Sequence, residues 1–390
     1  MPPKPHFLLL PLIVFSQFAG TSLWFAVNAV LIHIQPESGS GIANNTSIVQ
    51  FGFIAGTLIF SILNIADRFP AARVFFISAL LASLANLLVI FLGTDLTWLY
   101  VLRFITGFFL AGIYPVGMKI AADLFPEKLG HALGYLVGAL VLGTAFPFLV
   151  KSGLQDVHWK KVLIFTSALA FSGGLLMLLF AKAKHLTIKK EINYRAALQV
   201  FRSRAFKGAA YGYFGHMWEL YAFWAFVPMV IEFYNRTNAV ELPVAMFSFL
   251  VIAAGTLGCI IGGWFSKKHK SRKVAFIALL ISGGCCLIAP FLFYFPPVLF
   301  LFFLFIWGIT VVTDSPQFST LVAQAATSEN KGTALTIVTS IGFTITIISI
   351  QLLKLATSQL QQYGFLILLP GPVLGLIAMK KYLPRKGAGR

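Results

Sequence analysis

Charged residues are scarce in this sequence. They occupy 11% of its 390 positions, whereas hydrophobic residues occupy 58%; soluble globular proteins carry about 25% charged and about 45–50% apolar residues. A water-soluble fold of this length needs more surface charge than the chain contains, so soluble enzymes and disordered regulators are excluded. The 40 Phe, 11 Tyr and 7 Trp are typical of helices that face lipid and its interfaces. We therefore interpret the chain as an integral membrane protein embedded in a lipid bilayer.

Reactive and metal-binding residue types are also sparse. The three cysteines all lie in apolar stretches and lack the spacing of metal ligands or of a structural disulfide. The seven histidines are scattered, whereas a membrane enzyme needs a clustered constellation near one membrane face. No Gly-x-x-x-x-Gly-Lys-Ser/Thr loop is present, so the chain cannot drive itself with ATP. We expect no metal, no cofactor and no enzymatic activity.

Twelve apolar segments are long enough to cross a bilayer, which requires about 20 residues per helix. None shows the strict polar–apolar alternation of a barrel strand, so we predict an all-α membrane protein. One long basic connection divides it into an amino-terminal six-helix bundle (1–183), a linker (184–207) and a carboxyl-terminal six-helix bundle (208–390). The predicted spans are 7–33, 47–66, 74–94, 97–122, 132–152, 160–183, 208–232, 244–265, 274–295, 298–322, 334–355 and 362–382.

The basic residues predict the orientation of these spans. A net charge of +18 would suggest a nucleic-acid partner in a soluble protein. Here, however, one set of loops and ends holds 24 Lys and Arg and the other set only five. Under the positive-inside rule the richer set faces the cytoplasm. We therefore place both termini and the linker on the cytoplasmic side of a plasma (inner) membrane, and we expect no nucleic acid and a monomer.

The two halves share residues at an offset near 200, which predicts an internal repeat. Polar and glycine positions match in a consistent register, which chance apolar identities would not give. The matching pairs are Ala55–Leu58 with Ala254–Leu257, Arg73 with Arg272, Gly107 with Gly308, Pro115 with Pro316, and Glu127–Leu133 with Glu329–Leu335. Two parallel six-helix repeats of this kind build one large class of secondary transporters.

With these features the sequence resembles the major facilitator superfamily along its whole length. The loop 67–73, Asp-Arg-Phe-Pro-Ala-Ala-Arg, is similar to the cytoplasmic signature of that family, although Leu63 and Pro70 replace its two glycines. The fourth span carries Arg103-x-x-x-Gly107, similar to a second family motif. The fifth span matches the antiporter motif of that family only in part.

The resemblance implies a secondary active transporter that moves a small organic solute by alternating access with proton coupling. It also implies gate roles for Asp67, Arg68 and Arg73, because a carboxylate at one helix end can interact with the positive amino terminus of another. A non-transporting sensor on the same fold is the alternative, and a multi-span membrane enzyme is a weaker one. Nitrate is disfavoured because the second and eighth spans lack a mid-membrane arginine; a neutral, zwitterionic or cationic solute fits better.

Charged residues inside spans are costly in lipid and are candidates for function. Glu219 and His216 are three residues apart on one helix face, so they are either a proton-titrating pair in the central cavity or a fixed interhelical pair. Asp314 precedes Pro316 and is either a proton relay and flexing point or a tie for the local kink. Arg103 could bind an anion, pair with a carboxylate in proton coupling, or form a structural ion pair.

Polar and aromatic residues of the first and seventh spans are candidates for the substrate cavity. For the aromatic members, packing or lipid contact is the competing interpretation. The candidates are Gln17, Trp24, Asn28, Tyr213, Trp218 and Tyr221.

Overall fold

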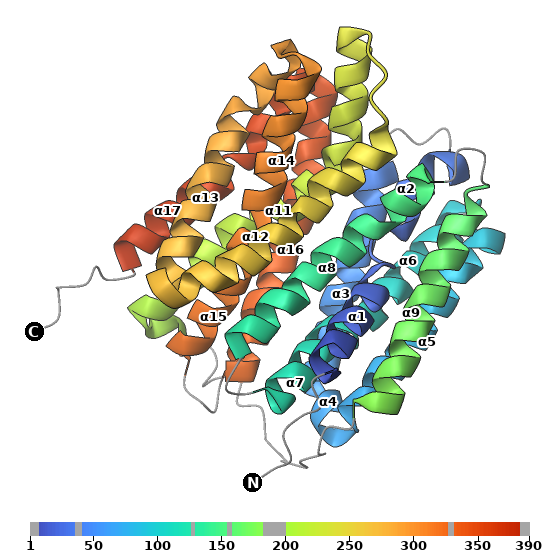
Figure 1. The fold of residues 1–390 in the computed structure, drawn as a ribbon, viewed down its shortest axis with the longest axis vertical. Helices are drawn as coiled ribbons and strands as arrows, with labels where there is room; N and C mark the ends of the chain where they lie inside the picture. Colours follow the sequence, from blue (N-terminus) through green and yellow to red (C-terminus); the bar gives the residue numbers. More distant parts are fainter. Residues whose placement is uncertain are drawn as a thin grey trace, which may run out of the picture.

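A computed structural model describes residues 8–35, 41–125, 129–153, 158–181, 200–326 and 331–382, and within these ranges the fold is entirely helical (Figure 1). The amino-terminal bundle contains α1 (Leu9–Thr21), α2 (Ala26–Ile34), α3 (Gly41–Ile62), α4 (Ile65–Arg68), α5 (Ala71–Leu92), α6 (Leu96–Leu110), α7 (Tyr114–Leu124), α8 (Leu129–Ser152) and α9 (Lys160–Phe180). The carboxyl-terminal bundle contains η2 (Val200–Arg202), α11 (Arg204–Asn238), α12 (Val244–His269), α13 (Ser271–Ile288), η3 (Ala289–Tyr294), α14 (Pro297–Thr313), α15 (Ser315–Ala325), α16 (Lys331–Leu360), η4 (Gln361–Leu368) and α17 (Pro370–Tyr382).

These elements form the twelve predicted spans. Ten stretches of the described residues are long and apolar enough to cross a bilayer. One of them, 332–382, holds both the eleventh and the twelfth span, and α11 adds the remaining one. Most of the predicted linker lies outside the described residues; α11 itself begins at Arg204, a few residues before the predicted start of the seventh span.

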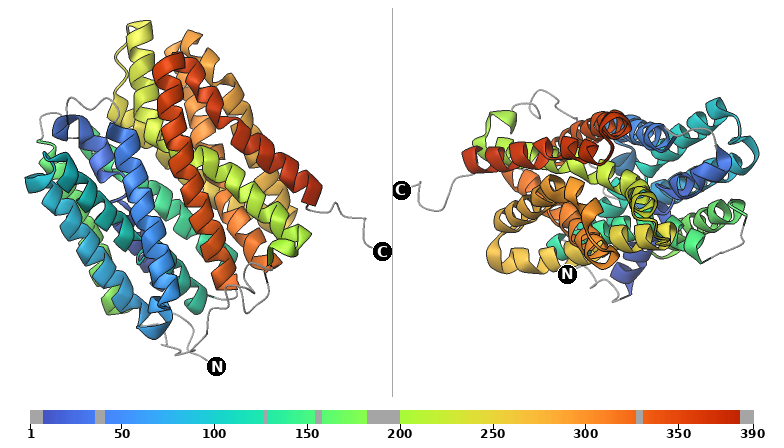
Figure 2. Two further views of the ribbon diagram at one scale, coloured as in Figure 1. Left: turned by 180° about the vertical axis from the view of Figure 1, so that it is seen from behind. Right: turned by 90° about the horizontal axis from the view of Figure 1, so that it is seen from above.

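The helices pack in the same way in both halves (Figures 1 and 2). In the amino-terminal bundle α3 packs on α6, α5 on α9, and α1 on α8 and α9. The equivalent spans of the other bundle form α12 on α14, α13 on α17, and α11 on α16 and α17. The predicted pair of pseudo-symmetric six-helix bundles is therefore confirmed.

Two glycines at the predicted offset make the corresponding close helix contacts. A Cβ on Gly107 of α6 would lie 2.1 Å from the Val49 carbonyl oxygen of α3. A Cβ on Gly308 of α14 would lie 2.1 Å from the Val251 carbonyl oxygen of α12. Since any side chain at either site would collide with backbone, the same residue type supports the same crossing in each bundle.

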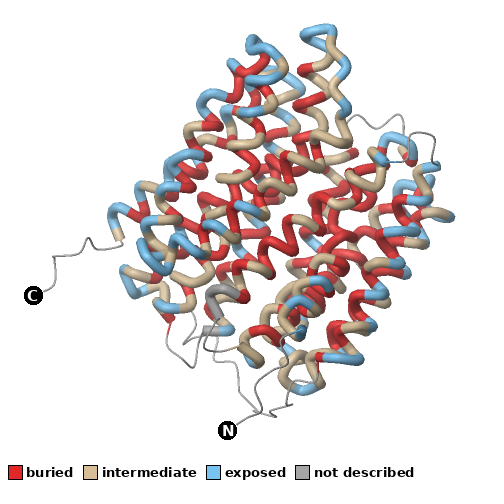
Figure 3. Tube along the Cα trace, in the orientation of Figure 1, coloured by how far each residue is buried: buried red, intermediate tan, exposed pale blue. Residues whose placement is uncertain are grey.

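The bundles meet along two seams, α8 against α12 and α3 against α16. On the first seam Thr256 Oγ1 donates a 3.1 Å hydrogen bond to the Gly138 carbonyl. On the second, Gln351 Nε2 donates to Ser47 Oγ at 2.8 Å and to Asn44 Oδ1 at 3.3 Å. The most deeply buried residues lie where the helices cross in the middle of the molecule (Figure 3).

Three spans are broken near their middle. Residues Ser22–Phe25 separate α1 from α2, Ala111–Ile113 separate α6 from α7, and Asp314 separates α14 from α15. Prolines explain the last two breaks, because Pro115 and Pro316 lack the N–H that would continue each helix. Broken helices at membrane depth occur where the freed backbone groups are buried in protein, so these breaks mark the interior of the two bundles.

Candidate functional site

An aromatic cluster lies between the bundles. It consists of Trp24 and Phe53 from the amino-terminal bundle and Tyr221 and Phe343 from the carboxyl-terminal bundle, all buried. The ring centroids of Trp24 and Tyr221 are 5.6 Å apart in a stacked arrangement, and those of Phe53 and Phe343 are 4.5 Å apart. Two predicted cavity residues, Trp24 and Tyr221, are thus in direct contact, and the aromatic cluster fills the centre of the bundle interface.

Arg103 of α6 donates hydrogen bonds to the backbone at the break in the first span. Its guanidinium is fully buried and donates to the Trp24 carbonyl at 2.7 Å and to the Leu23 carbonyl at 3.4 Å. No carboxylate lies within 4.0 Å of it among the described residues. The guanidinium therefore satisfies backbone oxygens left free by the break, and its Nε remains buried without a hydrogen-bond partner.

Several hydrogen-bonded polar side chains of α2 and α3 lie beside this break. Asn28 Nδ2 donates to Thr46 Oγ1 at 2.7 Å, and Asn45 Nδ2 donates to Asn28 Oδ1 at 2.5 Å. Gln50 lies one turn beyond Thr46 on the same face of α3, fully buried, and neither its amide nitrogen nor its oxygen has a partner. Unpaired buried amides are costly, so Gln50 and the Arg103 Nε offer hydrogen-bonding capacity to a solute.

Glu219 of α11 is buried inside the carboxyl-terminal bundle, with 1% of its surface exposed. Its Oε1 accepts a 2.6 Å hydrogen bond from Trp307 Nε1 on α14, and its Oε2 accepts a 3.0 Å bond from Ser282 Oγ on α13. Both donors are neutral. No basic side chain lies within 4.0 Å of this carboxylate in the described parts of the chain.

His216 and Asp314 form the second buried polar pair. His216 Nδ1 lies 2.8 Å from Asp314 Oδ1, and both side chains are 1% exposed. Asp314 occupies the break between α14 and α15, so the pair joins α11 to that break. This differs from the predicted pairing of His216 with Glu219: each of the two contacts another helix instead, although they lie one turn apart on α11.

The other predicted cavity residues are distributed around the bundles. Gln17 packs against α7, where a Cβ on Gly117 would lie 2.1 Å from Gln17 Oε1. Tyr213 packs against α16 at Gly342. Trp218 Nε1 donates a 2.7 Å bond to the Ile367 carbonyl of η4, which places this indole against the twelfth span and not against the aromatic cluster.

The predicted gate residues lie together at the end of the amino-terminal bundle where α1 begins. The Asp67 carboxylate forms a 3.0 Å ion pair with Lys119 of α7, and Lys119 also contacts Asp123 at 3.2 Å. Arg68 ends α4 and Arg73 lies in the first turn of α5, both exposed. The partner of Asp67 is therefore a lysine of its own bundle, whereas the sequence suggested a helix amino terminus.

Sequence reasoning missed several residues of this centre. Trp307, Ser282 and Gln50 belong to it, as does Phe343 of the aromatic cluster. Gln50 carried a usable signal, because an amide in the middle of an apolar span needs a partner. The sequence gives no comparable indication for Trp307 and Ser282, because tryptophan and serine are common in membrane helices.

Comparison with known proteins agrees with this architecture. Residues 9–350 match the family model described as Major Facilitator Superfamily. A galacturonate transporter of Dickeya chrysanthemi is 27% identical over 48% of this chain and 61% of its own length. A hexuronate transporter of Escherichia coli (strain K12) is 29% identical over 40% of each chain, and the niacin transporter NiaP of Acinetobacter baylyi is 37% identical over 24% of each. The alignments to the first two relatives thus span about half of their length.

A solved structure shares the fold. A variant of the E. coli fucose:proton symporter FucP superposes with a TM-score of 0.68 over 97% of this chain and 100% of its own, at 15% identity. At that identity the similarity bears on the fold alone. The family model, by contrast, covers most of the sequence, and the bundles, seams and repeated glycine contacts described above have the arrangement that the resemblance implied. The chain belongs to the major facilitator superfamily.

Proposed function

We propose that this protein is a secondary transporter that moves a small organic monocarboxylate together with a proton by alternating access. The observation that carries the proposal is the environment of Glu219: a buried carboxylate with two neutral hydrogen-bond donors and no cation within 4.0 Å among the described residues. A buried charge without a partner is costly, and binding one proton removes that charge. Glu219 is therefore the proposed proton carrier.

The charge balance of the buried side chains supports coupling to an anion. His216 and Asp314 neutralise each other when both are ionised. Among the buried side chains of the described residues, what remains is one positive charge on Arg103 in the amino-terminal bundle and one negative charge on Glu219 in the carboxyl-terminal bundle. A single carboxylate near Arg103 and a single proton on Glu219 would neutralise both bundles together, so loading the two ligands favours a state with little uncompensated buried charge.

The relatives support the same class of solute. Their names specify galacturonate, hexuronate and niacin, and each of these acids carries one carboxyl group. One buried arginine suits a singly charged anion better than a multiply charged one. A monocarboxylate therefore replaces the neutral, zwitterionic or cationic solute that we expected from the sequence. Gln50 and Asn28 would face the polar part of the solute, and Trp24 and Tyr221 its ring or carbon skeleton.

Asp314 and His216 would pass the proton between Glu219 and the inner side of the membrane. His216 lies one turn of α11 nearer than Glu219 to the end at which α1 begins, and its partner Asp314 lies at the break where α15 can change its angle to α14. The gate residues Asp67, Arg68 and Arg73 lie at this same end. We place this end, and both chain termini, in the cytoplasm on the basis of the loop charges.

The experiment that tests the proposal uses sealed proteoliposomes that contain a pH-sensitive dye. Addition of D-galacturonate to the outside should acidify the lumen, because each solute enters with a proton. D-Galactose, which has the same ring without the carboxylate, should not do so, and protein-free liposomes should show no response to either. Uptake of radiolabelled galacturonate without proton movement would contradict proton coupling, and no uptake of any monocarboxylate tested would contradict the substrate class.

A further inference from the structure

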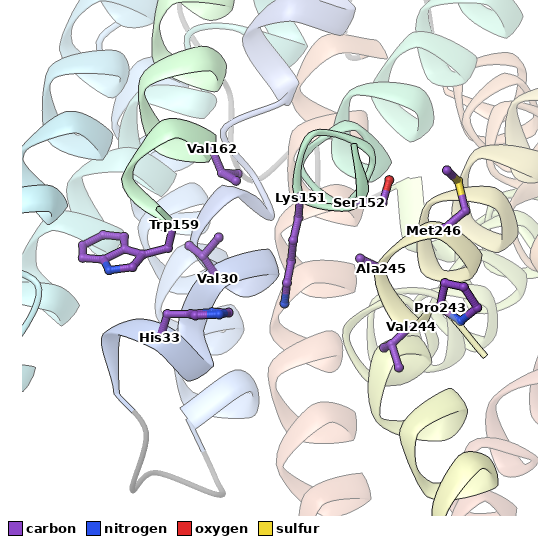
Figure 4. Close-up of a pocket in the computed structure, with 10 residues that line it drawn as sticks. All are labelled: Val30, His33, Lys151, Ser152, Trp159, Val162, Pro243, Val244, Ala245 and Met246. Carbon is purple, nitrogen blue, oxygen red and sulfur yellow. The ribbon is translucent and has the colours of Figure 1, made fainter. Parts of the chain in front are cut away.

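A cavity of about 490 Å³ opens between the two bundles at the end opposite the gate residues (Figure 4). Its volume lies in the range of small-molecule sites. Both bundles line it: α2, α8 and α9 on one side and the start of α12 on the other. The residues that form it are Val30, His33, Lys151, Ser152, Trp159, Val162, Pro243, Val244, Ala245 and Met246.

Among the described residues that line this cavity, two are potential cations and none is an acid. The Lys151 side chain and the His33 ring are directed toward the same space (Figure 4). Among the described residues no carboxylate lies within 4.0 Å of the Lys151 ammonium. The acid that interacts with it over a longer distance, Glu232 of α11, is already paired with Arg236. The cavity thus presents positive charge that no acid of the described part of the protein contacts directly.

The cavity lies farther from the gate residues than the aromatic cluster does. It lies at the outer mouth of the α8–α12 seam, where Pro243–Met246 of one bundle face Lys151 and Ser152 of the other. Trp24 lies in the break just before α2, and His33 lies seven residues beyond Ala26, the first residue of α2, which corresponds to about 10 Å at 1.5 Å per residue. A solute that approaches from the outer side therefore meets this cavity before it reaches the aromatic cluster.

We infer that this cavity is an outer subsite that binds small organic monocarboxylates through Lys151 and His33 before they enter the transport site. This inference rests on the proposed function for the identity of the ligand. The Lys151 ammonium supplies a charge-assisted hydrogen bond to the carboxylate, and His33 supplies a second donor at neutral pH or a second charge at lower pH. The apolar wall at the start of α12 contacts the rest of the solute.

Thiol labelling of the purified full-length protein tests the subsite directly. Ser152→Cys places one reactive thiol in the cavity, while Cys259, Cys285 and Cys286 are buried and react slowly. D-Galacturonate and nicotinate should slow maleimide labelling of this thiol in a saturable way. D-Galactose and nicotinamide, which lack the carboxylate, should leave the rate unchanged.

Two further substitutions in the Ser152→Cys background assign the effect to the cavity. Lys151→Gln should raise the concentration for half-protection about tenfold, as expected for loss of a charge-assisted hydrogen bond. Lys161→Gln removes an exposed lysine of the same membrane face that does not line the cavity, so it should change nothing. Protection that survives Lys151→Gln, equal protection by the uncharged analogues, or no protection by either acid would overturn the inference.

This experiment is independent of transport. It uses detergent-solubilised protein without a pH gradient, so it reports on the cavity even if Glu219 carries no proton. Failure of the labelling test together with proton-coupled uptake would remove the outer subsite and leave the proposed function in place. Protection by carboxylates without proton movement in the liposome assay would keep the outer subsite and contradict the proposed proton coupling.

Discussion

Trp307 Nε1 lies 2.6 Å from Glu219 Oε1, and this hydrogen bond joins α14 to α11 inside the carboxyl-terminal bundle. An indole N–H can only donate, so it stabilises the ionised carboxylate more than the neutral acid. Ser282 differs, because its hydroxyl can donate to Glu219 or turn to the Leu279 carbonyl, 3.3 Å away, and accept a proton from a neutral Glu219. One partner therefore favours proton release and the other accommodates both protonation states.

Replacing Trp307 with Phe should shift the pH dependence of uptake to higher pH. The aromatic ring retains its stacking on Phe223, whose centroid lies 4.4 Å away, but the donor to Glu219 is lost. A hydrogen bond to a charged group contributes about 1.5–3 kcal/mol, which corresponds to about one to two pH units in the midpoint of proton-coupled uptake. Trp264→Phe on the exposed face of α12 is the control, and a profile that moves equally in both variants would argue against this role.

The two crossing glycines should be equally sensitive to substitution. Gly107→Ala and Gly308→Ala each place a methyl group 2.1 Å from a backbone oxygen, and overpacking of this kind costs about 1–3 kcal/mol. Gly263→Ala on α12, where nothing lies within 4 Å of the added Cβ, serves as the matched control. Thermal unfolding in detergent should show a lower Tm for the first two variants and no loss for the third; an unchanged Tm in either of the first two would contradict the proposed packing.

Arg103→Lys should destabilise the protein although it retains the charge. A lysine has no planar fork with which to reach the Leu23 and Trp24 carbonyls together, so we expect a loss of about 1.5–3 kcal/mol, the value of one charge-assisted hydrogen bond. Thermal unfolding measures the loss, and solute protection of the unfolding transition measures any effect on binding. Full stability of Arg103→Lys would show that the break between α1 and α2 does not depend on the guanidinium.

Gln351→Leu should loosen the α3–α16 seam at the end opposite the gate residues. The substitution removes the hydrogen bonds to Ser47 and Asn44, which together contribute about 1–2 kcal/mol and so shift the open–closed equilibrium about five- to thirtyfold. An Asn44→Cys thiol itself removes one of these bonds, so in that background Gln351→Leu removes only the bond to Ser47, about 0.5–1.5 kcal/mol, and labelling by an impermeant maleimide should become about two- to tenfold faster. Gln362→Leu, in η4 and away from this seam, should leave the labelling rate unchanged; no acceleration in Gln351→Leu would show that these bonds do not hold the seam closed.

Much of the fold could be predicted from the sequence because lipid imposes strong rules on it. Length, hydropathy and loop charge defined the twelve spans, and the offset of Gly107 and Gly308 anticipated a repeated helix crossing. The breaks at Ala111–Ile113 and Asp314 follow from Pro115 and Pro316. The break at Ser22–Phe25 has no proline and depends on Arg103, a residue 79 positions from Trp24, so local sequence could not predict it.

The pairing of the buried side chains was the part that the sequence could not determine. His216 and Glu219 are neighbours on one helix face, and helical spacing alone predicts that they interact. Their real partners, Asp314 and Trp307, come from another span, and the choice depends on how α11 is rotated against α14. Rotation is set by packing against several helices at once, which a single sequence does not encode in any short-range pattern.

The most direct test of proton coupling compares two modes of transport in Glu219→Gln proteoliposomes. Glutamine keeps the size of the side chain and its hydrogen bond from Trp307 but cannot titrate. Accumulation of a radiolabelled monocarboxylate driven by a pH gradient should be abolished, while counterflow exchange, which needs no net proton movement, should persist. Glu232→Gln, near the carboxyl-terminal end of the same helix, should retain both activities. Full gradient-driven accumulation by Glu219→Gln would contradict the assignment of Glu219 as the proton carrier.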